Sequence, residues 1–332
     1  MSMRLQEYLY QARWFAPFRL ILSWLYLLII STRNTFFDWG VFKTTAIQTP
    51  VVSVGNISVG GSGKTVLIEA LIESFLDQQK RPVVLSRGYG RHSKGLVLVA
   101  DNDRVLVTPE EGGDEPVMIA HNHPGVPVVV CADRVAAARF IETKFRPDVI
   151  LLDDGFQHRK LHRDINILIL DTPDLRRDHI LPRGRLREPV SSIHRADVIL
   201  YSKSAERPNS DANLHFEVSS VLMSAKGFSV PIDQLEKPIG LFAGIGNPQY
   251  FFNALTKLSP SIQTTLSFPD HTSYKRQDYD LILDQNCSSW ITTQKDMIKL
   301  DPDFCIQNNV YTSLVKTGLP PILRDALKHY FK

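Results

Sequence analysis

Residues 49–70 read TPVVSVGNISVGGSGKTVLIEA, and this stretch decides the fold. Its apolar run at 51–54 predicts a buried strand, and the sequence after it predicts a glycine-rich loop that leads into a helix. Gly60, Gly61 and Gly63 permit backbone conformations that are closed to other residues. Consecutive N–H groups can then turn inward and bind phosphate oxygens at the start of the helix.

The end of this loop matches most of the phosphate-binding pattern G-x-x-x-x-G-K-[ST]. Its last five positions, GSGKT, are intact, whereas Ser58 stands where the pattern has its first glycine. Lys64 would reach the β- and γ-phosphates of a nucleoside triphosphate, and the Thr65 hydroxyl would bind Mg²⁺. An ordinary turn before a helix is the alternative that the context disfavours. The predicted nucleotide contacts are Ser58, Val59, Gly60, Gly61, Ser62, Gly63, Lys64 and Thr65.

The composition is that of a soluble globular protein, with 332 residues of which 43% are hydrophobic and 22% are charged. This length suffices for one large domain or two ordinary ones. A formal net charge of +3 is too small to indicate nucleic acid as a partner, and we expect none. Cys131, Cys287 and Cys305 form no C-x-x-C pair, which predicts reduced thiols in a cytosolic setting and no structural zinc.

The first forty residues differ in character from the rest of the chain. Residues 20–30, LILSWLYLLII, are continuously apolar apart from Ser23, and Arg19 and Arg33 flank them. This run is shorter than the roughly 20 residues that span a bilayer, so we expect a helix that lies at the membrane surface. A helix packed on the protein's own core is the alternative. A signal peptide fits poorly, because no small-residue cleavage site follows.

From Thr49 onward, apolar runs alternate with helical stretches. This alternation predicts an α/β fold of the phosphate-loop type, with a mostly parallel sheet covered by helices on both faces. The polar stretch at 204–213, SAERPNSDAN, is a candidate domain boundary. We therefore expect a membrane-associating helix in residues 1–40, a phosphate-loop core in 41–205 and a smaller α/β domain in 206–332.

Two adjacent carboxylates end the apolar run DVILLDD at 148–154. In phosphate-loop proteins a second parallel strand ends beside the loop, and an acidic residue there holds Mg²⁺ directly or through water. Asp153 and Asp154 fit that role. A plain solvated turn is the alternative, and the phosphate loop upstream disfavours it.

Two further loops carry polar residues. The segment SRGYGR at 86–91 follows a predicted strand and should face the nucleotide or the acceptor, with Arg87 on a phosphate and Tyr89 stacking or hydrogen-bonding. Asp114 lies in GGDEP at 112–116. It is either the carboxylate that a hydroxyl-phosphorylating kinase needs near the acceptor or only the cap of the following helix, and the residues alone leave these readings equal.

Two segments are dense in Arg and His, namely QHRKLHRD at 157–164 and RRDHILPRGRLRE at 176–188. Their guanidinium groups suit phosphate recognition, although a solvated basic surface is an equal alternative. The loop at 183–187 is the better candidate, because its Pro-Arg-Gly-Arg framing constrains it.

Two motifs of the predicted second domain follow strands. In FPDHT at 268–272, an Asp beside His271 can orient the ring and keep it basic for proton transfer. In TTQKD at 292–296, Lys295 could touch the nucleotide or close the cleft. Neither pattern is specific by itself, since such groups also occur in ordinary polar turns.

Taken together and in this order, the motifs resemble the tetraacyldisaccharide 4'-kinases, the lipid A 4'-kinases of Gram-negative bacteria. The resemblance covers most of the chain and rests on SVGNISVGGSGKT, LSRGYGR, GDEP, CADR, ILLDDGFQH, PRGRLREP, FPDH and TTQKD. The family's loop also lacks the first glycine, so Ser58 agrees with it. Val66 and Gln294 depart from the family pattern, where Pro and Glu are usual.

The resemblance implies transfer of the γ-phosphate of ATP to the 4'-hydroxyl of a tetraacylated glucosamine disaccharide 1-phosphate. It implies ATP and Mg²⁺ as cofactors, an anionic glycolipid as substrate, and a place at the cytoplasmic face of the bacterial inner membrane. We also expect a monomer.

Roles for individual residues follow from the same resemblance. Asp114 would deprotonate or orient the hydroxyl with support from His271, and Arg187 would steady the transferring phosphoryl group. The implied Mg²⁺ ligands are Thr65, Asp153 and Asp154, with Glu188 assisting. The implied substrate-binding residues are Arg87, Tyr89, Arg134, Gln157 and His158.

Two other functions are compatible with a phosphate loop. A membrane-partitioning ATPase would need a water-positioning residue and usually a dimerising surface, and no feature of the sequence requires either. A non-catalytic adaptor would keep nucleotide only as a structural element. The presence of Lys64, Thr65 and both aspartates argues against the adaptor, because a binding shell alone does not need them all.

Overall fold

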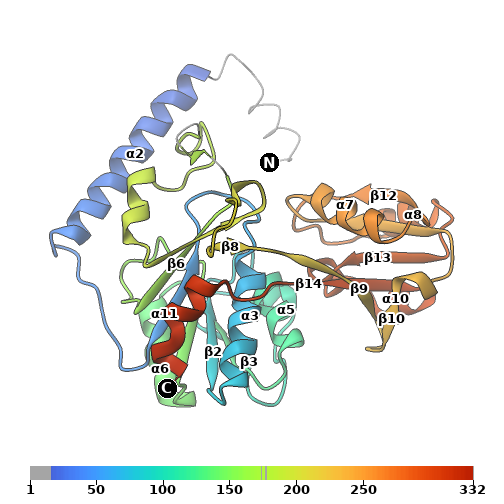
Figure 1. Cartoon of the computed structure of the whole chain (residues 1–332), viewed down its shortest axis with the longest axis horizontal. Coiled ribbons are helices and arrows are strands. Elements are labelled where there is room, and N and C mark those ends of the chain that lie inside the picture. Colours follow the sequence, from blue (N-terminus) through green and yellow to red (C-terminus); the bar gives the residue numbers. More distant parts are fainter. Residues whose placement is uncertain (1–15, 173, 176–177, 332) are drawn as a thin grey trace.

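The computed structural model describes residues 16–172, 174–175 and 178–331 as two α/β units and one projecting helix (Figure 1). The first fifteen residues of the predicted membrane-associating segment lie outside this description. The same holds for residues 176 and 177 at the start of the second basic segment.

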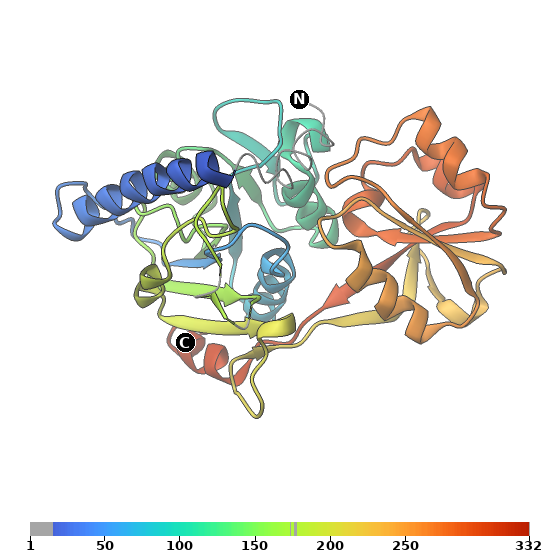
Figure 2. The ribbon, with the colours of Figure 1, turned by 90° about the horizontal axis from the view of Figure 1, so that it is seen from above.

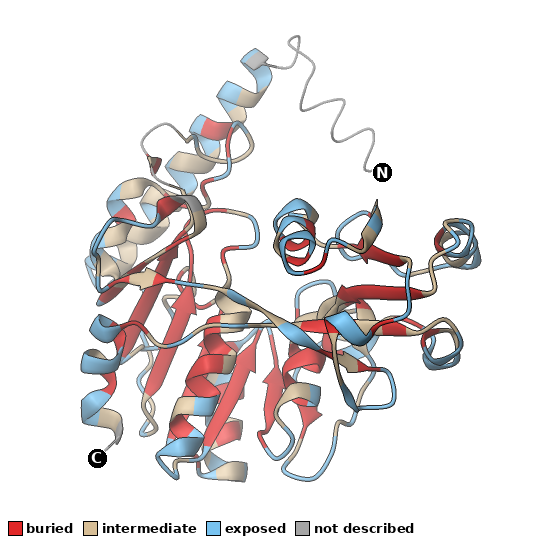
Figure 3. Ribbon diagram, turned by 45° about the vertical axis from the view of Figure 1, so that its right-hand side comes forward, coloured by how far each residue is buried: buried red, intermediate tan, exposed pale blue. Residues whose placement is uncertain are grey.

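The first unit is built on an eight-stranded sheet with the order β3-β4-β2-β5-β1-β6-β7-β8. All neighbouring pairs are parallel except β3 with β4. The central strands are entirely buried because helices cover both faces, as Figure 3 shows. The strands are β1 Val51–Gly55, β2 Pro82–Ser86, β3 Val97–Ala100, β4 Val128–Val130, β5 Val149–Asp153, β6 Ile165–Leu170, β7 Val198–Ser202 and β8 Asn213–Leu214.

The two helical layers pack on opposite faces of this sheet. On one face, apolar side chains of α3 and α5 join those of the strands in one core cluster, and on the other face α6 forms a second cluster. The helices of this unit are α3 Lys64–Asp77, α4 Pro109–Gly112, α5 Asp114–Asn122, α6 Arg134–Phe145 and α11 Pro321–Phe331, with 3-10 turns η3 Val190–Arg195 and η4 Lys203–Ala205. The expected fold class, a mostly parallel α/β sheet covered on both faces, is confirmed.

The second unit is a six-stranded sheet with the order β10-β9-β14-β13-β11-β12, and Figure 2 shows it beside the first. Its strands are β9 Glu217–Ser224, β10 Ser229–Pro231, β11 Ile239–Ala243, β12 Ile262–Ser267, β13 Ser289–Thr293 and β14 Val310–Lys316. Its helices are α7 Pro248–Leu258, α8 Arg276–Leu283, α9 Gln294–Met297 and α10 Pro302–Gln307, with the 3-10 turn η5 Ile232–Gln234.

Two elements of the segment 206–332 lie in the first unit. Strand β8 pairs with β7, so the second sheet begins only at β9. Helix α11 returns to the first unit, where Leu323 and Leu327 are fully buried in the same core cluster as α3. An apolar helix face packs wherever the chain presents a matching surface, and the position of a helix in the sequence does not reveal that surface.

Helix α2, Ala16–Asp38, projects from the first unit and has 23 residues (Figure 1). At 1.5 Å per residue it is about 34 Å long, which compares with about 30 Å for the hydrocarbon core of a bilayer. The expectation of a helix too short to span a bilayer is therefore wrong, because the helix continues on both sides of the apolar run. Only 6% of its most apolar window is buried, so it is not packed on the protein's core.

Candidate active site

The phosphate loop connects β1 to α3 and is braced from several sides. Gly63 has a φ of +91°, and a Cβ at this position would lie 2.1 Å from Cζ of Phe216, so only glycine fits. Asn56 Nδ2 donates to Ser62 Oγ at 3.1 Å, and Gln157 Nε2 donates to the carbonyl oxygen of Asn56 at 2.8 Å. The predicted substrate residue Gln157 thus supports the loop from behind.

The two aspartates lie beside this loop because β5 pairs directly with β1, with Val54 opposite Asp153. Asp153 is buried, and its Oδ2 accepts a hydrogen bond from Ser86 Oγ at 3.0 Å. Lys64 Nζ lies 3.5 Å from Asp154 Oδ1. The structure therefore brings together the lysine and the carboxylates that the sequence predicts for one site.

Arg187 joins the same group. Its Nη1 donates to Asp154 Oδ2 at 2.8 Å, and its backbone N–H donates to the carbonyl oxygen of Ile57 at 2.7 Å. Ser58 and Leu186 form an antiparallel bridge next to it. The predicted Arg183–Arg187 loop thus lies along the phosphate loop, with Arg187 half-buried against it and Arg183 and Arg185 exposed.

The pKa values of the two aspartates are shifted in opposite directions. Burial raises the pKa of Asp153, and the nearby charges of Glu115 and Asp154 raise it further. Burial would also raise the pKa of Asp154, but Lys64 and Arg187 outweigh it and lower this pKa below its usual value. Lys64 and Arg187 therefore favour the ionised form of Asp154. Asp153 lacks such compensation, so a further cation beside it would be needed to favour its ionised form.

The residues at this position fit a magnesium ion. Within the described ranges no group of three or more His, Cys, Asp or Glu side chains is placed to hold a metal, so an ion would need the Thr65 hydroxyl and phosphate oxygens as well. Asp153 Oδ1 is buried and has no hydrogen-bond partner among the described residues. An unpaired carboxylate oxygen next to a phosphate loop suits a cation.

Glu188 makes its polar contacts with residues outside this group. It is completely buried, and its oxygens accept hydrogen bonds from Arg33 Nη2 at 2.9 Å, from Asn34 Nδ2 at 3.4 Å and from Arg195. These contacts satisfy the carboxylate away from Asp153, so the geometry gives no support to its expected part in magnesium binding.

A second group of charged residues forms where the two units meet. Asp114 is the first residue of α5, and its Oδ2 lies 3.0 Å from Nδ1 of His271, which follows β12. No side chain caps α5, whose N-cap is Gly113 at a φ of +91°. Of the two readings that the sequence left equal, the structure therefore removes helix capping and keeps the carboxylate–histidine pair.

Two lysines of the second unit surround this pair. Lys299 Nζ lies 3.7 Å from Asp114 Oδ2, and Lys295 Nζ lies 3.4 Å from His271 Nε2. Burial would raise the pKa of Asp114, but the His271 hydrogen bond and the charges of Lys299, His271 and Lys295 lower it. Asp114 is therefore held as a carboxylate that can accept a proton.

The remaining predicted residues lie between the two groups or beside them. The ring of Tyr89 is exposed and lies 5.7 Å from that of His271, centroid to centroid. Arg134 is buried, and burial followed by the charge of Arg87 lowers its pKa. Burial, together with Arg134 and Arg163, lowers the pKa of His158 to about 4.

Sequence reasoning missed several residues of the site. Lys203 donates to the carbonyl oxygen of Gly61, and Ser202 Oγ donates to that of Ser62 at 3.2 Å. The available signal was their place at the carboxyl end of β7, where ligand-facing loops of parallel sheets lie. Lys299 had no such signal, because it follows a short helix and reaches the site only through the packing of the second unit.

Comparisons with known proteins agree with this geometry. The family model described as LpxK, tetraacyldisaccharide-1-P 4'-kinase, matches residues 15–332. The tetraacyldisaccharide 4'-kinase of Aquifex aeolicus is 40% identical over 284 residues, which cover 84% of this chain and 88% of that protein. The enzyme of that name from Geobacter metallireducens is 35% identical over 313 residues, covering 90% and 93%.

The same likeness extends to three dimensions. A crystal structure of LpxK from Aquifex aeolicus in complex with ATP superposes with a TM-score of 0.78 and 36% sequence identity, covering 94% of this chain and 98% of that one. The matched regions include the phosphate loop and both units. The chain therefore belongs to the tetraacyldisaccharide 4'-kinase family.

Proposed function

We propose that this protein transfers the γ-phosphate of ATP to the 4'-hydroxyl of a tetraacylated disaccharide 1-phosphate. Family membership supports this reaction, and one observation carries it for these residues. The Asp114–His271 pair is completed across the two units at 3.0 Å. Glu115, the neighbour of Asp114, is close enough for its charge to raise the pKa of Asp153.

The donor side consists of the loop, its lysine and the arginine behind it. Backbone N–H groups at the start of α3 and the Lys64 ammonium would hold the phosphates, and Arg187 would contact the group in transfer. Thr65, Asp153 and Asp154 would hold Mg²⁺, which when bound neutralises phosphate charge.

The acceptor side consists of Asp114 and its neighbours. The ionised carboxylate would orient the 4'-hydroxyl and receive its proton as the new O–P bond forms and the bond to the ADP oxygen breaks. His271 would fix the orientation of the carboxylate through the Nδ1 contact, and the charges of Lys299 and Lys295 favour its ionised form. A carboxylate of low pKa suits this task, because the hydroxyl proton leaves late in phosphoryl transfer.

The test incubates the full chain with γ-labelled ATP, Mg²⁺ and the disaccharide 1-phosphate in detergent micelles. We expect label on the lipid at the 4' position. Asp114→Asn should lower kcat by roughly 10² to 10⁴-fold, as for loss of a general base, while ATP affinity stays within about two-fold. Hydrolysis of ATP at the same rate with and without acceptor, and no labelled lipid, would favour the ATPase reading.

We further propose that α2 holds the enzyme at the cytoplasmic face of the bacterial inner membrane, where ATP and a membrane-embedded glycolipid meet. Its apolar side chains are exposed, including Phe18, Ile21, Trp24, Leu25, Leu28 and Ile29. A continuous exposed apolar ridge of this kind is unfavourable in water and suits the bilayer. We also propose that the working enzyme is a monomer, which light scattering in detergent would check.

A further inference from the structure

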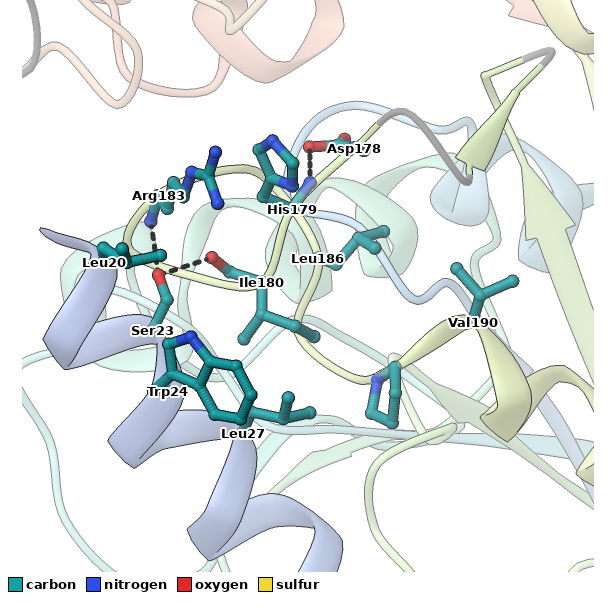
Figure 4. Close-up of a pocket in the computed structure, with 11 residues that line it drawn as sticks. Leu20, Ser23, Trp24, Leu27, Asp178, His179, Ile180, Arg183, Leu186 and Val190 are labelled. Atoms are coloured by element: carbon teal, nitrogen blue, oxygen red, sulfur yellow. Dashed lines mark hydrogen bonds between the residues drawn. The ribbon is translucent and has the colours of Figure 1, made fainter. Parts of the chain in front are cut away.

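Helix α2 has a second, polar side that faces the body of the enzyme. Ser23 is buried on this otherwise exposed helix, and its Oγ donates to the carbonyl oxygen of Ile180 and accepts from the backbone N–H of Arg183, both at 3.0 Å (Figure 4). The helix is therefore seated on the loop that leads to Arg187. A helix that served only as an anchor would not need these contacts.

Two further contacts continue down the same side of the helix. Tyr26 Oη donates to the carbonyl oxygen of Arg187 at 3.0 Å, and Arg33 Nη2 donates to Glu188 Oε1 at 2.9 Å. The positions 23, 26 and 33 are three and seven residues apart, which places them on one helix face. This face thus holds the backbone of Arg187 and the side chain of the residue after it.

Glu188 is the strongest of these attachments. Its side chain is 0% exposed and is paired with the guanidinium groups of Arg33 and Arg195. A buried carboxylate is tolerated only when it is paired, and loss of its charge leaves the largely buried guanidinium group of Arg195 and the partly exposed one of Arg33 without this acceptor. Breaking the Arg33–Glu188 contact between α2 and this loop is therefore expected to cost free energy.

The segment 185–188 also contacts the phosphate loop, on the side away from α2. The N–H of Arg187 donates to the carbonyl oxygen of Ile57 at 2.7 Å, and the N–H of Val59 donates to that of Arg185 at 2.8 Å. Residues 185–188 thus lie between the phosphate loop and α2 and form hydrogen bonds with both. The side chain of Arg187 extends from this segment, and its Nη1 lies 2.8 Å from Asp154 Oδ2.

We propose that Tyr26, Arg33 and Glu188 are positioning residues that set the place of the Arg187 guanidinium. The helix whose apolar side is exposed for the membrane is, by its polar side, part of the support of the phosphoryl-transfer site. This inference rests on the proposed function, in which Arg187 contacts the transferring phosphoryl group. It gives Glu188 a task that its contacts support, in place of magnesium binding.

The test measures steady-state kinetics of full-length Glu188→Gln and Tyr26→Phe with detergent-dispersed acceptor. We expect kcat to fall on the order of 10²-fold for Glu188→Gln, the scale of a displaced electrostatic contact, and about three- to ten-fold for Tyr26→Phe, the scale of one hydrogen bond. The KM for ATP should stay within about two-fold, because the phosphate loop keeps its own bracing. Glu142→Gln is the matched control, because Glu142 Oε1 accepts from the Thr49 N–H at 2.7 Å away from this segment.

The decisive readout is the same pair of substitutions in an Arg187→Ala background. If Tyr26 and Glu188 act through Arg187, they should cost almost nothing more there, whereas independent effects would add. A further loss of the original size in that background would overturn the proposal. So would a kcat per folded molecule equal to that of the wild type, with only the melting temperature lowered.

The outcomes separate this inference from the proposed function. A wild-type chain with no labelled lipid product contradicts the kinase reaction itself. An active wild type whose Tyr26→Phe variant matches it contradicts only the positioning role. Because Tyr26→Phe removes one hydroxyl and no charge, it keeps the test conclusive if Glu188→Gln does not fold.

Discussion

Lys299, which lies outside the sequence motifs, adds to the positive charge around Asp114, the proposed base. Its side chain is 6% exposed, and its Nζ lies 3.7 Å from Asp114 Oδ2 and 3.3 Å from Asp296 Oδ1. Asp296 is itself fixed, since its Oδ2 accepts from the Gly244 N–H and the Thr293 hydroxyl. The ammonium group is therefore held where it favours the ionised form of Asp114.

Replacing Lys299 should move the pH dependence of the reaction. In Lys299→Met one of the charges that lower the pKa of Asp114 is gone, leaving His271 and Lys295, so this pKa rises. Protonated Asp114 cannot accept the hydroxyl proton, so the acidic limb of kcat/KM should shift to higher pH. Lys299→Arg should keep the wild-type limb. A limb that stays in place in Lys299→Met would contradict this role.

The buried carboxylate of Glu69 makes the stability of the fold depend on pH. Burial raises its pKa to about 7, against the lowering effect of the hydrogen bond that Asn122 Nδ2 donates at 2.6 Å. The folded protein therefore holds this proton more tightly than the unfolded chain. The resulting stability is fully present below about pH 4.5 and is lost as pH rises through about 7.

Glu69→Gln should abolish this loss. The glutamine carbonyl can still accept from Asn122, so the variant should gain up to about 3 kcal/mol over the wild type at pH 8 and less at pH 5. Chemical denaturation at the two pH values measures the difference. Asp77→Asn, at an exposed carboxylate of the same helix, is the control. An equal effect of Glu69→Gln at both pH values would contradict the assignment.

At the scale of elements, α2 has two faces of different character. Trp24 and Leu28 are 68% and 63% exposed, whereas Ser23 and Tyr26 hold the loop before and at Arg187. The exposed apolar face removes the alternative of a helix packed on the protein's own core, and membrane contact stays a prediction. The second face was not predictable, because Ser and Tyr in an apolar helix show no partner until the loop is packed against it.

The apolar face should carry the affinity for membranes. Trp24→Glu combined with Leu28→Glu should weaken vesicle binding by at least about 100-fold, since each buried side chain of this size contributes about 1.5 to 3 kcal/mol. Sedimentation with vesicles of bacterial lipids measures the bound fraction. Val221→Glu, at an exposed apolar position of the second unit, is the matched control. Sedimentation of the double variant equal to that of the wild type would show that α2 is not the anchor.

At the scale of the whole molecule, the two units meet between α5 and α9. Gln294 Nε2 donates to Asn122 Oδ1 at 2.8 Å, and Lys295 Nζ lies 3.7 Å from Glu115 Oε1. These contacts lie beside the Asp114–His271 pair, so they hold the histidine of one unit against the carboxylate of the other. The Asp114–His271 contact therefore forms only when the two units are docked.

Gln294→Ala should loosen this docking. Loss of one half-buried hydrogen bond of about 1 kcal/mol should lower kcat roughly five-fold, while ATP affinity, which depends on the first unit, stays unchanged. Steady-state kinetics with both substrates separates the two quantities. Gln249→Ala, whose side chain bonds only Asn253 within α7, is the control. An unchanged kcat for Gln294→Ala would mean that the units dock without this bond.

The sequence by itself determined the elements and the donor side of the site. Strand β1, the phosphate loop and α3 are contiguous, and Asp153 ends a strand whose apolar run marks it as central, so local patterns suffice there. The family resemblance came from the order of these motifs. Short-range patterns fix which residues can bind phosphate, because the binding groups are neighbours in the chain.

Only the tertiary structure decided the acceptor side and its supports. Asp114 and His271 meet across 157 positions, Tyr26 reaches Arg187 across 161, and α11 returns to the first sheet. These contacts depend on how two units and one helix dock, which is set by the fit of whole surfaces. Burial and charge act through that fit, so the state of Asp114 and the pairing of Glu188 could not be predicted from residue order.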